Sequence, residues 1–562
     1  ALDGSNYLGI GTHLKYYIEE GGAFNDITPI RLTTGAGDVT FAASNASTTL
    51  VVHDASHGAV ESDFVTFSGA ASLGGNVTAA VLNAEHQIVR IVDANRYEIT
   101  LSVTANSSDS GNGGSSTVGA YQINVGLDTV VGGTGWGAGA WSRGAWGSAE
   151  PNGLTTVTQI RLWSHDNFGE DLIINPRDDN LYYWDRTNNV SSRAIELSTK
   201  SGTKTSVPQI AKQVLVSDQD RHVIAFGCDG LGASSSATQG DGTQDPLLIR
   251  FSSQENPIDW FPTSTNTAGD LRLGSGSRFI QAVETKREIL VWTDTSLNSM
   301  RFIGPPFTFG LQQLASNITI MGPNAAVGTE DVVYWMGIDN FYVYAGQTQQ
   351  LPCAVKDKVF LDFNLGQTDK VVAGVNSEFA EVFWFYPSAG SDDNDRYVIY
   401  NYADQIWYFG NLARTSWIDR GTRTYPIAAS NSYLYNHEFG YDDDGSSMNS
   451  FIESGVMDIG DGDRFTYIKR VIPDLTFTGS TNLSTPQATF TLKSRNFPGG
   501  DFDNTASGTA TRTQSSPVEL FTNQLHTRTR GRSFAMRIES NALGSKWKLG
   551  SPRVDMQQDG RR

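Results

Sequence analysis

The sequence predicts an all-β protein: a β-propeller core with an inserted small β-barrel or sandwich module and a C-terminal β-domain. Three observations predict this class. Glycine accounts for 58 of the 562 residues, and the runs between glycines are short and rich in β-branched or aromatic residues. A strand–turn–strand pattern recurs along the chain. Only residues 355–363 show a clear helical spacing of apolar side chains.

The recurring unit is an apolar strand, a short polar turn and a second strand that carries aromatic residues. Successive strand starts lie about 43 to 66 residues apart, which is the range of four-stranded propeller blades. The starts used for this spacing are Leu172, Val223, Ile289, Val332, Val382 and Tyr433. A blade buries its two faces only against neighbouring blades, so a radial stack of blades explains the aromatic strands. A long two-sheet sandwich is the alternative architecture.

Four tryptophans within these repeats are expected to pack between blades. They are Trp184, Trp260, Trp292 and Trp335. Tryptophan supplies a large buried area, and this role fits residues that recur with the repeat. Stacking against sugar rings is the alternative role.

The composition divides the chain into five segments. Residues 1–43 are predicted to form the first propeller strands, and 44–104 an inserted small β-module. Residues 105–150 combine a Gly/Ser-rich flexible linker with a glycine-tryptophan loop. Residues 151–445 hold the propeller blades. Residues 446–562 form a separate β-domain or a closing blade with an extension, and end in a basic tail.

Charge and composition exclude several classes of protein. The chain has 41 Lys and Arg against 60 Asp and Glu, a net charge of −19, which is the wrong sign for a general nucleic-acid binder. Two cysteines are too few for a disulfide framework. No run approaches 18 consecutive apolar residues, so we expect no membrane insertion.

No catalytic, cofactor or metal motif is present in the sequence. The histidines lack metal-ligand spacing, and neither a Gly-x-Ser-x-Gly elbow nor a phosphate-binding loop occurs. We therefore expect no enzyme activity, no cofactor and no metal. Acidic turns at 392–395, 442–444 and 458–463 lack a complete calcium loop and are interpreted as solvated hairpin tips, with calcium as the alternative. A glycosidase carboxylate pair leaves no spacing signal, so that alternative stays open.

Four longer stretches resemble a known family. They are residues 161–172, 249–260, 377–388 and 528–538. Together they resemble the tail nozzle proteins of short-tailed bacteriophages, also called tail tubular or packaged-DNA-stabilisation proteins, from about residue 150 to the end and over 7–29. Members of that family usually have more chain before the first blade, so the start at Ala1 departs from the family pattern and suggests that a preceding piece is missing.

The resemblance implies a structural virion protein located in the phage tail. It implies a homohexamer that continues the DNA channel below the portal and adaptor, retains the packaged genome and conducts it at ejection. The implied partners are the tail adaptor, tail fibre, spike or needle proteins, and genomic DNA that passes through the lumen without specific binding. A net charge of −19 suits that passage, because carboxylates repel phosphates.

A ring requires contacts between unlike surfaces of neighbouring subunits. We expect two features to supply inter-subunit or partner contacts, and the residues are Trp136, Trp141, Trp146, Arg528, Arg530 and Arg532. Capping of the propeller within one subunit is the alternative role of the tryptophan loop. The alternative function is a carbohydrate-binding or glycoside-cleaving β-propeller tail fibre or spike protein.

Overall fold

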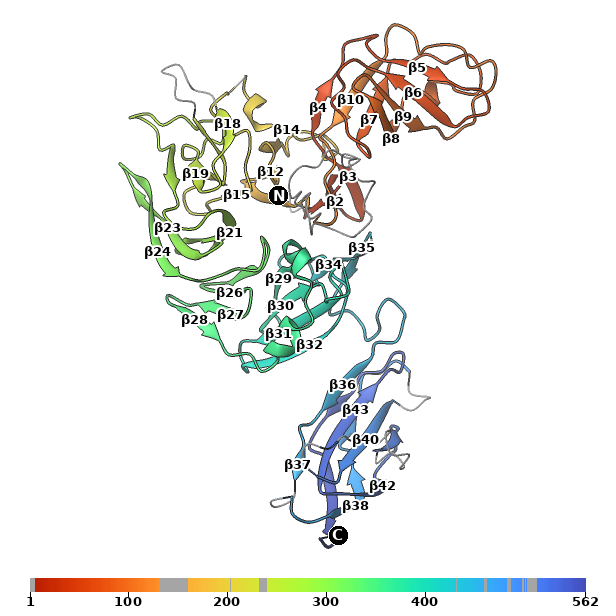
Figure 1. Ribbon diagram of the computed structural model, residues 1–562, viewed down its shortest axis with the longest axis vertical. Helices are drawn as coiled ribbons and strands as arrows, with labels where there is room; N and C mark the ends of the chain where they lie inside the picture. Colours follow the sequence, from red (N-terminus) through yellow and green to blue (C-terminus); the bar gives the residue numbers. More distant parts are fainter. Residues whose placement is uncertain are drawn as a thin grey trace, which may run out of the picture. The chain divides into compact units, whose positions relative to one another are not determined.

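The computed structural model describes residues 6–130, 160–202, 204–231, 240–430, 432–458, 462–482, 487–497, 500, 502 and 513–561. The described chain is all-β, as predicted, and forms many small antiparallel sheets (Figure 1). It divides into two compact units, Ala1–His437 (unit 1) and Glu438–Arg562 (unit 2). The predicted helix at 355–363 is confirmed as the short helix α2 (Lys356–Phe360). No described helix is long and apolar enough to cross a membrane.

Unit 1 begins with a small sheet and a β-module. The small sheet holds β1 (Leu8–Gly11), β2 (Tyr16–Glu20) and β3 (Ala23–Asp26). The module is one seven-stranded sheet in the order β4 (Ile30–Thr33), β10 (Val118–Gln122), β7 (Phe64–Ser68), β8 (Glu85–Asp93), β9 (Arg96–Thr100), β6 (Thr49–His53) and β5 (Thr40–Ala43). The helix α1 (Ala79–Leu82) precedes β8.

This module is wider than the predicted range 44–104, because β4, β5 and β10 lie outside that range. Residues 105–117, which composition predicted to be a flexible linker, pack onto the module. Ala105 and Asp109 are buried, and the carbonyl of Asn112 accepts a hydrogen bond from Phe41 N at 3.0 Å. The Asp109 carboxylate accepts from the backbone N–H of Val77 at 2.9 Å. A polar, glycine-rich segment is therefore ordered here by hydrogen bonds that composition does not reveal.

Five four-stranded antiparallel sheets follow in chain order. The first holds β11 (Trp163–Phe168), β12 (Asp171–Pro176), β13 (Tyr182–Trp184) and β14 (Ile195–Glu196). The second holds β15 (Gln213–Val216), β16 (Val223–Phe226), β19 (Leu248–Phe251) and β20 (Gly269–Arg272), with the side hairpin β17 (Asp229–Leu231) and β18 (Gly240–Gln244). The third holds β21 (Phe279–Glu284), β22 (Ile289–Thr293), β23 (Ser296–Gly304) and β24 (Thr308–Ser316).

The fourth sheet holds β25 (Ala326–Thr329), β26 (Val332–Met336), β27 (Phe341–Tyr344) and β28 (Thr348–Leu351). The fifth holds β29 (Val372–Asn376), β30 (Glu381–Tyr386), β31 (Arg396–Asn401) and β32 (Ile406–Asn411). A three-stranded sheet of β33 (Ser416–Ile418), β34 (Ile427–Ser430) and β35 (Tyr433–Asn436) ends unit 1. Two 3-10 helices, Leu197–Thr199 and Leu365–Lys370, lie in connections.

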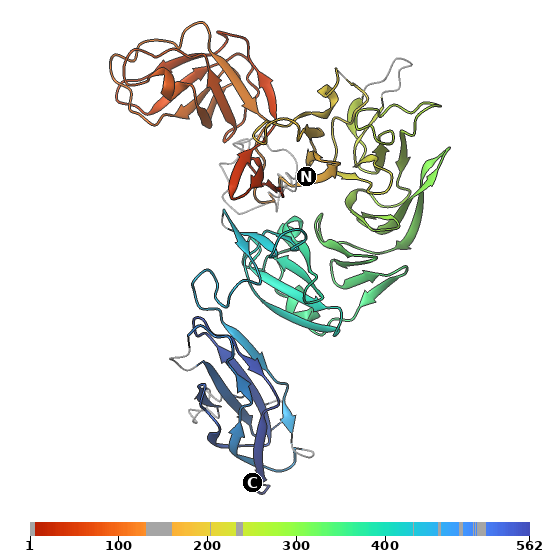
Figure 2. The ribbon, with the colours of Figure 1, turned by 180° about the vertical axis from the view of Figure 1, so that it is seen from behind.

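The first strands of successive sheets lie side by side, in the order β11, β15, β21, β25, β29 and β33. Figures 1 and 2 show the sheets following one another around a common centre, from two opposite sides. Arg423, between β33 and β34, forms an ion pair with Glu19 of β2 and so joins the last sheet of unit 1 to the first. The strand starts predicted at Val223, Ile289 and Val332 coincide with the starts of second strands β16, β22 and β26.

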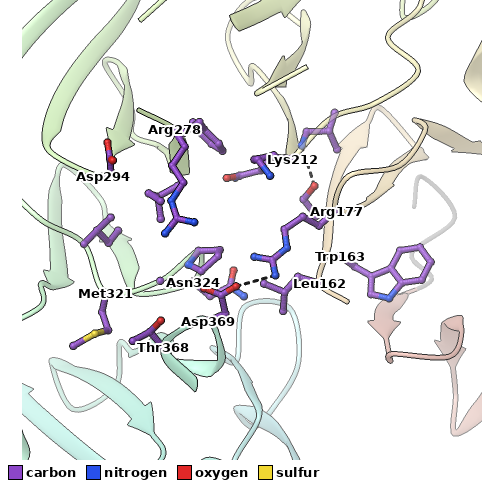
Figure 3. A pocket seen from close by; sticks show the side chains of 18 of the residues that line it. Leu162, Trp163, Arg177, Lys212, Arg278, Asp294, Met321, Asn324, Thr368 and Asp369 are labelled. Carbon is purple, nitrogen blue, oxygen red and sulfur yellow. Dashed lines mark hydrogen bonds and ion pairs between the residues drawn. The ribbon is translucent and has the colours of Figure 1, made fainter. Parts of the chain in front are cut away.

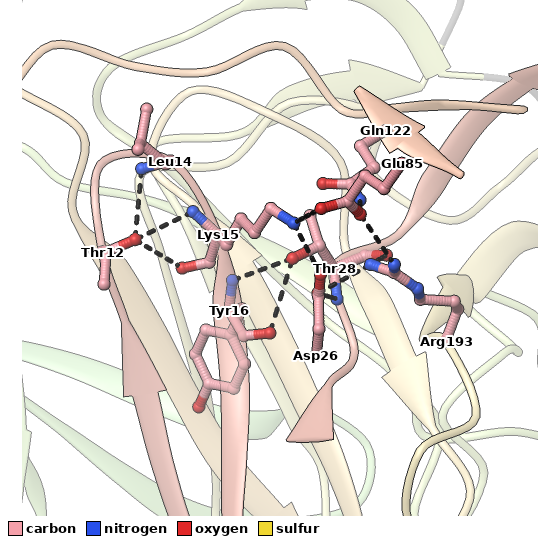
Figure 4. A network of polar contacts seen from close by, with 9 residues as sticks. All are labelled: Thr12, Leu14, Lys15, Tyr16, Asp26, Thr28, Glu85, Gln122 and Arg193. Atoms are coloured by element: carbon pink, nitrogen blue, oxygen red, sulfur yellow. Dashed lines mark hydrogen bonds and ion pairs between the residues drawn. The ribbon is translucent and has the colours of Figure 1, made fainter. Parts of the chain in front are cut away.

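A network of charged side chains holds the module against the small sheet of β1, β2 and β3 (Figure 4). The buried ammonium of Lys15 lies 2.9 Å from Asp26 Oδ2 and also pairs with Glu85 of β8. Arg193 pairs with the same two carboxylates, at 2.6 Å from Asp26 and 3.4 Å from Glu85. Burial opposes ionisation of Asp26, but hydrogen bonds from Thr28 and Lys15 keep its pKa below the usual range.

Unit 2 has two main sheets around one apolar core. The first holds β36 (Ser450–Glu453), β43 (Ser533–Ser540), β40 (Ala488–Arg495) and β41 (Thr513–Val518), and β37 (Met457–Asp458) also pairs with β43. The second holds β42 (Leu525–Gly531), β38 (Thr466–Ile472) and β45 (Arg553–Gln558). A small pair holds β39 (Leu475–Thr476) and β44 (Lys548–Leu549).

Candidate functional site at the centre of the sheets

A cavity of about 510 Å³ lies where the first strands of the successive sheets begin (Figure 3). Its wall comes from β11, from the starts of β15 and β21, and from the segments that precede β25 and β29. Apolar side chains such as Ile280, Ile320 and Met321 form part of the wall. The volume is within the usual range for small-molecule sites.

Three cations line this cavity, and two of them are neutralised by aspartates. The Arg177 side chain is only 7% exposed, and its Nη2 donates to Asp369 Oδ2 at 2.9 Å and to the carbonyl of Ile160 at 2.8 Å. Lys212 Nζ lies 2.8 Å from Asp178 Oδ1. Arg278 is exposed, and no described carboxylate lies within 4 Å of it. Arg278 is thus the cation of this wall with no described ion-pair partner.

The carboxylates at this end of the strands are also committed to neighbours. Asp369 pairs with Arg177, and Asp294 accepts hydrogen bonds from the Ser277 hydroxyl and from the Ser277 N–H, the latter at 2.8 Å. Burial opposes ionisation of Asp294, yet the Ser277 hydrogen bonds hold its pKa below the usual range. An ionised, hydrogen-bonded carboxylate does not supply a proton, so Asp294 does not suit a general acid.

Four carboxylates gather toward the later part of the first strands, and one of them, Asp166, also lines the central cavity. They are Asp166 of β11, Asp218 and Asp220 of the turn after β15, and Glu284 of β21. The Asp218 N–H donates to Glu284 Oε1 at 3.0 Å. Burial, reinforced by the neighbouring carboxylates, raises the pKa of Asp166 to about 6 and that of Glu284 to about 7. No described cation lies within 4 Å of these four groups, so their mutual repulsion is not compensated.

The sequence did not predict this acidic group, because its members come from three different repeats. These side chains become neighbours only when the sheets pack in succession, so their spacing in the sequence does not reveal them. Within the described ranges no three His, Cys, Asp or Glu side chains are arranged to hold a metal ion. At the acidic turns, Asp393 instead pairs with Lys370, and Asp442 accepts a hydrogen bond from Gly544 N at 2.6 Å.

The four tryptophans predicted to pack between blades are all buried, at 2% exposure or less. Trp292 of β22 and Trp335 of β26 meet across two neighbouring sheets, with ring centroids 5.4 Å apart. Trp260 lies after β19, and its Nε1 donates to the carbonyl of Pro257 at 2.7 Å. Trp184 ends β13 and contacts Tyr7 edge to face. None of these four lines the central cavity.

The residues predicted for subunit or partner contacts differ in how available their side chains are to another molecule. Trp136, Trp141 and Trp146 lie outside the described residues. Arg528 is exposed on β42. By contrast, Arg530 and Arg532 stack on Phe465, at 4.0 and 4.9 Å from the ring centroid, and bind the C-terminal segment at Asp559 and Arg561. Among these arginines, Arg528 is therefore the one whose side chain is most available to another molecule.

Comparisons with known proteins identify no family. No protein-family profile matches the chain, and no curated protein matches it. Solved structures with partial similarity include Kluyvelomyces marxianus Hsv2, with 6% identity, a TM-score of 0.29 and coverage of 50% of this chain and 73% of that one. The AfRom2 CNH domain has 9% identity, a TM-score of 0.29 and coverage of 48% and 78%. The phage phi92 endosialidase has 10% identity, a TM-score of 0.17 and coverage of 69% and 53%. These TM-scores are too low to support a conclusion about fold or function.

Proposed function

We propose that the chain is a structural, non-enzymatic virion protein: the hexameric tail nozzle of a short-tailed bacteriophage. The observation that carries the proposal is the placement of the four stretches that resemble this family. They contribute to β11 and the turn after it, to β19 and the turn after it, to β30, and to β42 with β43. The resemblance thus extends over both units and over separate sheets.

A β-propeller is the architecture we propose for the sheets of unit 1. Five successive four-stranded antiparallel sheets with adjacent first strands support it, since blades pack in this way around an axis. The Trp292–Trp335 contact supports it as well, because it joins neighbouring sheets through their faces. The Arg423–Glu19 ion pair would complete the ring between the last and the first sheet.

The distribution of charge favours a DNA conduit. Residues 438–562 contain 15 Lys and Arg and 15 Asp and Glu, so the whole net charge of −19 belongs to unit 1. Carboxylates that face a channel repel phosphates over a Debye length of about 8 Å at physiological salt. In the proposed ring, an acidic unit 1 keeps genomic DNA mobile in the lumen and prevents specific binding.

The proposed assembly determines location and partners. The protein belongs to the phage tail, contacts the adaptor above it and tail fibre, spike or needle proteins beside or below it, and retains the genome until ejection. Mass photometry of the purified chain, alone and with the adaptor, tests this proposal. We expect a complex that contains six copies of the chain. A stable trimer would contradict the nozzle and favour a fibre or spike.

One observation favours the alternative of a glycoside-cleaving propeller. Paired-carboxylate glycosidases require one protonated acid and one ionised carboxylate. Glu284, with a pKa raised to about 7, keeps its proton to higher pH than the neighbouring Asp166, whose pKa is raised to about 6. Incubation of the chain with bacterial surface polysaccharides tests this function by release of reducing ends. If cleavage occurs and is lost in Asp166→Asn and Glu284→Gln, the alternative replaces the nozzle.

A further inference from the structure

The second sheet of unit 2 exposes one face on which basic side chains collect. Along β42 the side chains alternate, so Leu525 and Thr527 are buried while Arg528 is exposed. In β38 the register shifts between Ile468 and Arg470, and Lys469 is exposed at this irregularity between the buried Ile468 and Val471. Arg553 at the start of β45 is exposed beside Ile472 of β38. We call Lys469, Arg528 and Arg553 the basic face.

The charges of the basic face lack partners within the described chain. Two further arginines of the same sheet are paired: Arg470 lies 3.6 Å from Asp555, and Arg530 pairs with Asp559. No described carboxylate lies within 4 Å of Lys469, Arg528 or Arg553. Three uncompensated positive charges therefore remain on one side of a three-stranded sheet.

The other main sheet of unit 2 pairs two of its three cations with carboxylates. There Glu453 pairs with Lys493 at 2.7 Å and with Arg537 at 3.2 Å, and Arg537 also pairs with Glu539 at 2.8 Å. Lys493 and Arg537 are thus balanced by neighbouring carboxylates, whereas Arg495 of β40 lies over the ring of Phe502, at 5.6 Å from its centroid. Unit 2 has equal numbers of acidic and basic residues, and three of its cations without a described carboxylate within 4 Å lie on the three neighbouring strands β42, β38 and β45.

We propose that the basic face contacts the phosphate backbone of duplex DNA without reading its sequence. Charge complementarity carries this choice of partner, since duplex DNA presents one negative charge per about 1.7 Å of its axis. Arg528, Lys469 and Arg553 lie on three neighbouring strands, and neighbouring strands are about 4.8 Å apart, so the face presents all three cations to one duplex. Three contacts bind weakly, and a weak contact permits the DNA to slide.

This inference goes beyond the proposed nozzle and does not need the ring to form. The nozzle as proposed only repels DNA, whereas the basic face adds a local point of attraction outside unit 1. The two ideas fail separately, because the stoichiometry of the complex tests the nozzle and binding to DNA tests the basic face.

Fluorescence anisotropy of the full chain with labelled duplexes of about 30 base pairs, in two unrelated sequences and from about 25 to about 200 mM salt, measures this contact. We expect equal affinity for both sequences. The logarithm of the binding constant should fall with the logarithm of salt concentration with a slope of about −2.7 for three phosphate contacts. Each of Arg528→Gln, Lys469→Gln and Arg553→Gln should make that slope less steep by about 0.9.

Lys548→Gln is the matched control, because Lys548 is an exposed lysine of unit 2 on β44 and lies outside the basic face. It should leave affinity and slope unchanged, and circular dichroism should show the wild-type fold for every variant. Absence of wild-type binding at about 25 mM salt, or a triple variant that binds like wild type, would overturn the proposal. So would a triple variant that loses binding to a second copy of the chain or to anionic lipid vesicles but keeps its affinity for DNA.

Discussion

Replacement of Trp292 by alanine is expected to destabilise unit 1 strongly. Trp292 is fully buried on β22 and packs edge to face on Trp335 of the next sheet, with 66° between the ring planes. Truncation of a buried tryptophan leaves a large cavity and costs about 3–5 kcal/mol. Because the lost contacts join two sheets, the cavity lies in the core that holds the succession of sheets together.

The hydrogen bonds of the two indoles allow a sharper comparison. The Nε1–H of Trp292 has no described hydrogen-bond partner, whereas Nε1 of Trp335 donates to the carbonyl of Thr319 at 3.2 Å. A buried donor without a partner costs about 1–3 kcal/mol. Trp292→Phe removes both area and this unfavourable donor, while Trp335→Phe removes area and a hydrogen bond. We therefore expect Trp292→Phe to be less destabilising by about 1 kcal/mol or more.

Urea unfolding followed by far-ultraviolet circular dichroism measures the stability of each variant. The expected order of midpoints, from highest to lowest, is wild type, Trp292→Phe, Trp335→Phe and Trp292→Ala. Equal midpoints for the two phenylalanine variants would refute the argument from hydrogen bonding. If Trp292→Ala folds like the wild type but no longer binds glycans, packing between sheets is the wrong role and the carbohydrate alternative gains support.

Two further predictions concern the module and the acidic group. Replacement of residues 31–121 by a short Gly-Ser bridge should leave soluble protein. Deletion of 44–104 alone removes β6 to β9, so β5 loses its partner β6 and β10 loses β7, and aggregation should follow. Size-exclusion chromatography compares the two, and aggregation of the first deletion would show that the sheets need the module. Because the pKa of Glu284 is raised to about 7, the folded state holds a proton that the unfolded state releases, so stability falls as pH rises from about 4.5 to about 7. Glu284→Gln should therefore raise the melting temperature at pH values above 7 and leave it unchanged near pH 4, and an equal effect at both pH values would contradict this origin.

Regular strands and local periodicity were predictable from the sequence, because they depend on neighbouring residues. The predicted helix and the burial of the four tryptophans follow from such local patterns. The width of the module was not predictable in this way. Strand β10 pairs with β7 and β4, which precede it by more than 40 residues, and the glycines and serines before β10 predict a linker. The pairing of β10 with β7 and β4 orders this region although its composition is typical of a linker.

The central cavity and the acidic group were missed for a related reason. Asp166, Asp218 and Glu284 lie in three segments that come together only when first strands of successive sheets become neighbours. No local sequence motif indicates such a long-range contact. The same holds for Lys15 and Glu85, whose ion pair joins two sheets across 70 residues of chain. A local sequence pattern identifies individual strands and helices. The raised pKa values and the ion pairs arise from contacts between strands that are distant in the sequence.

Net charge is a poor guide to what one surface of this chain binds. The value of −19 predicts that the protein avoids nucleic acid, but the whole excess of acidic residues lies in unit 1. Screening limits the reach of those carboxylates to about 8 Å at physiological salt, so a surface farther away responds to its own charges. Within unit 2, no described carboxylate lies within 4 Å of Lys469, Arg528 or Arg553. The proposed repulsion of DNA by unit 1 and the proposed weak attraction to the basic face of unit 2 are therefore compatible in one chain.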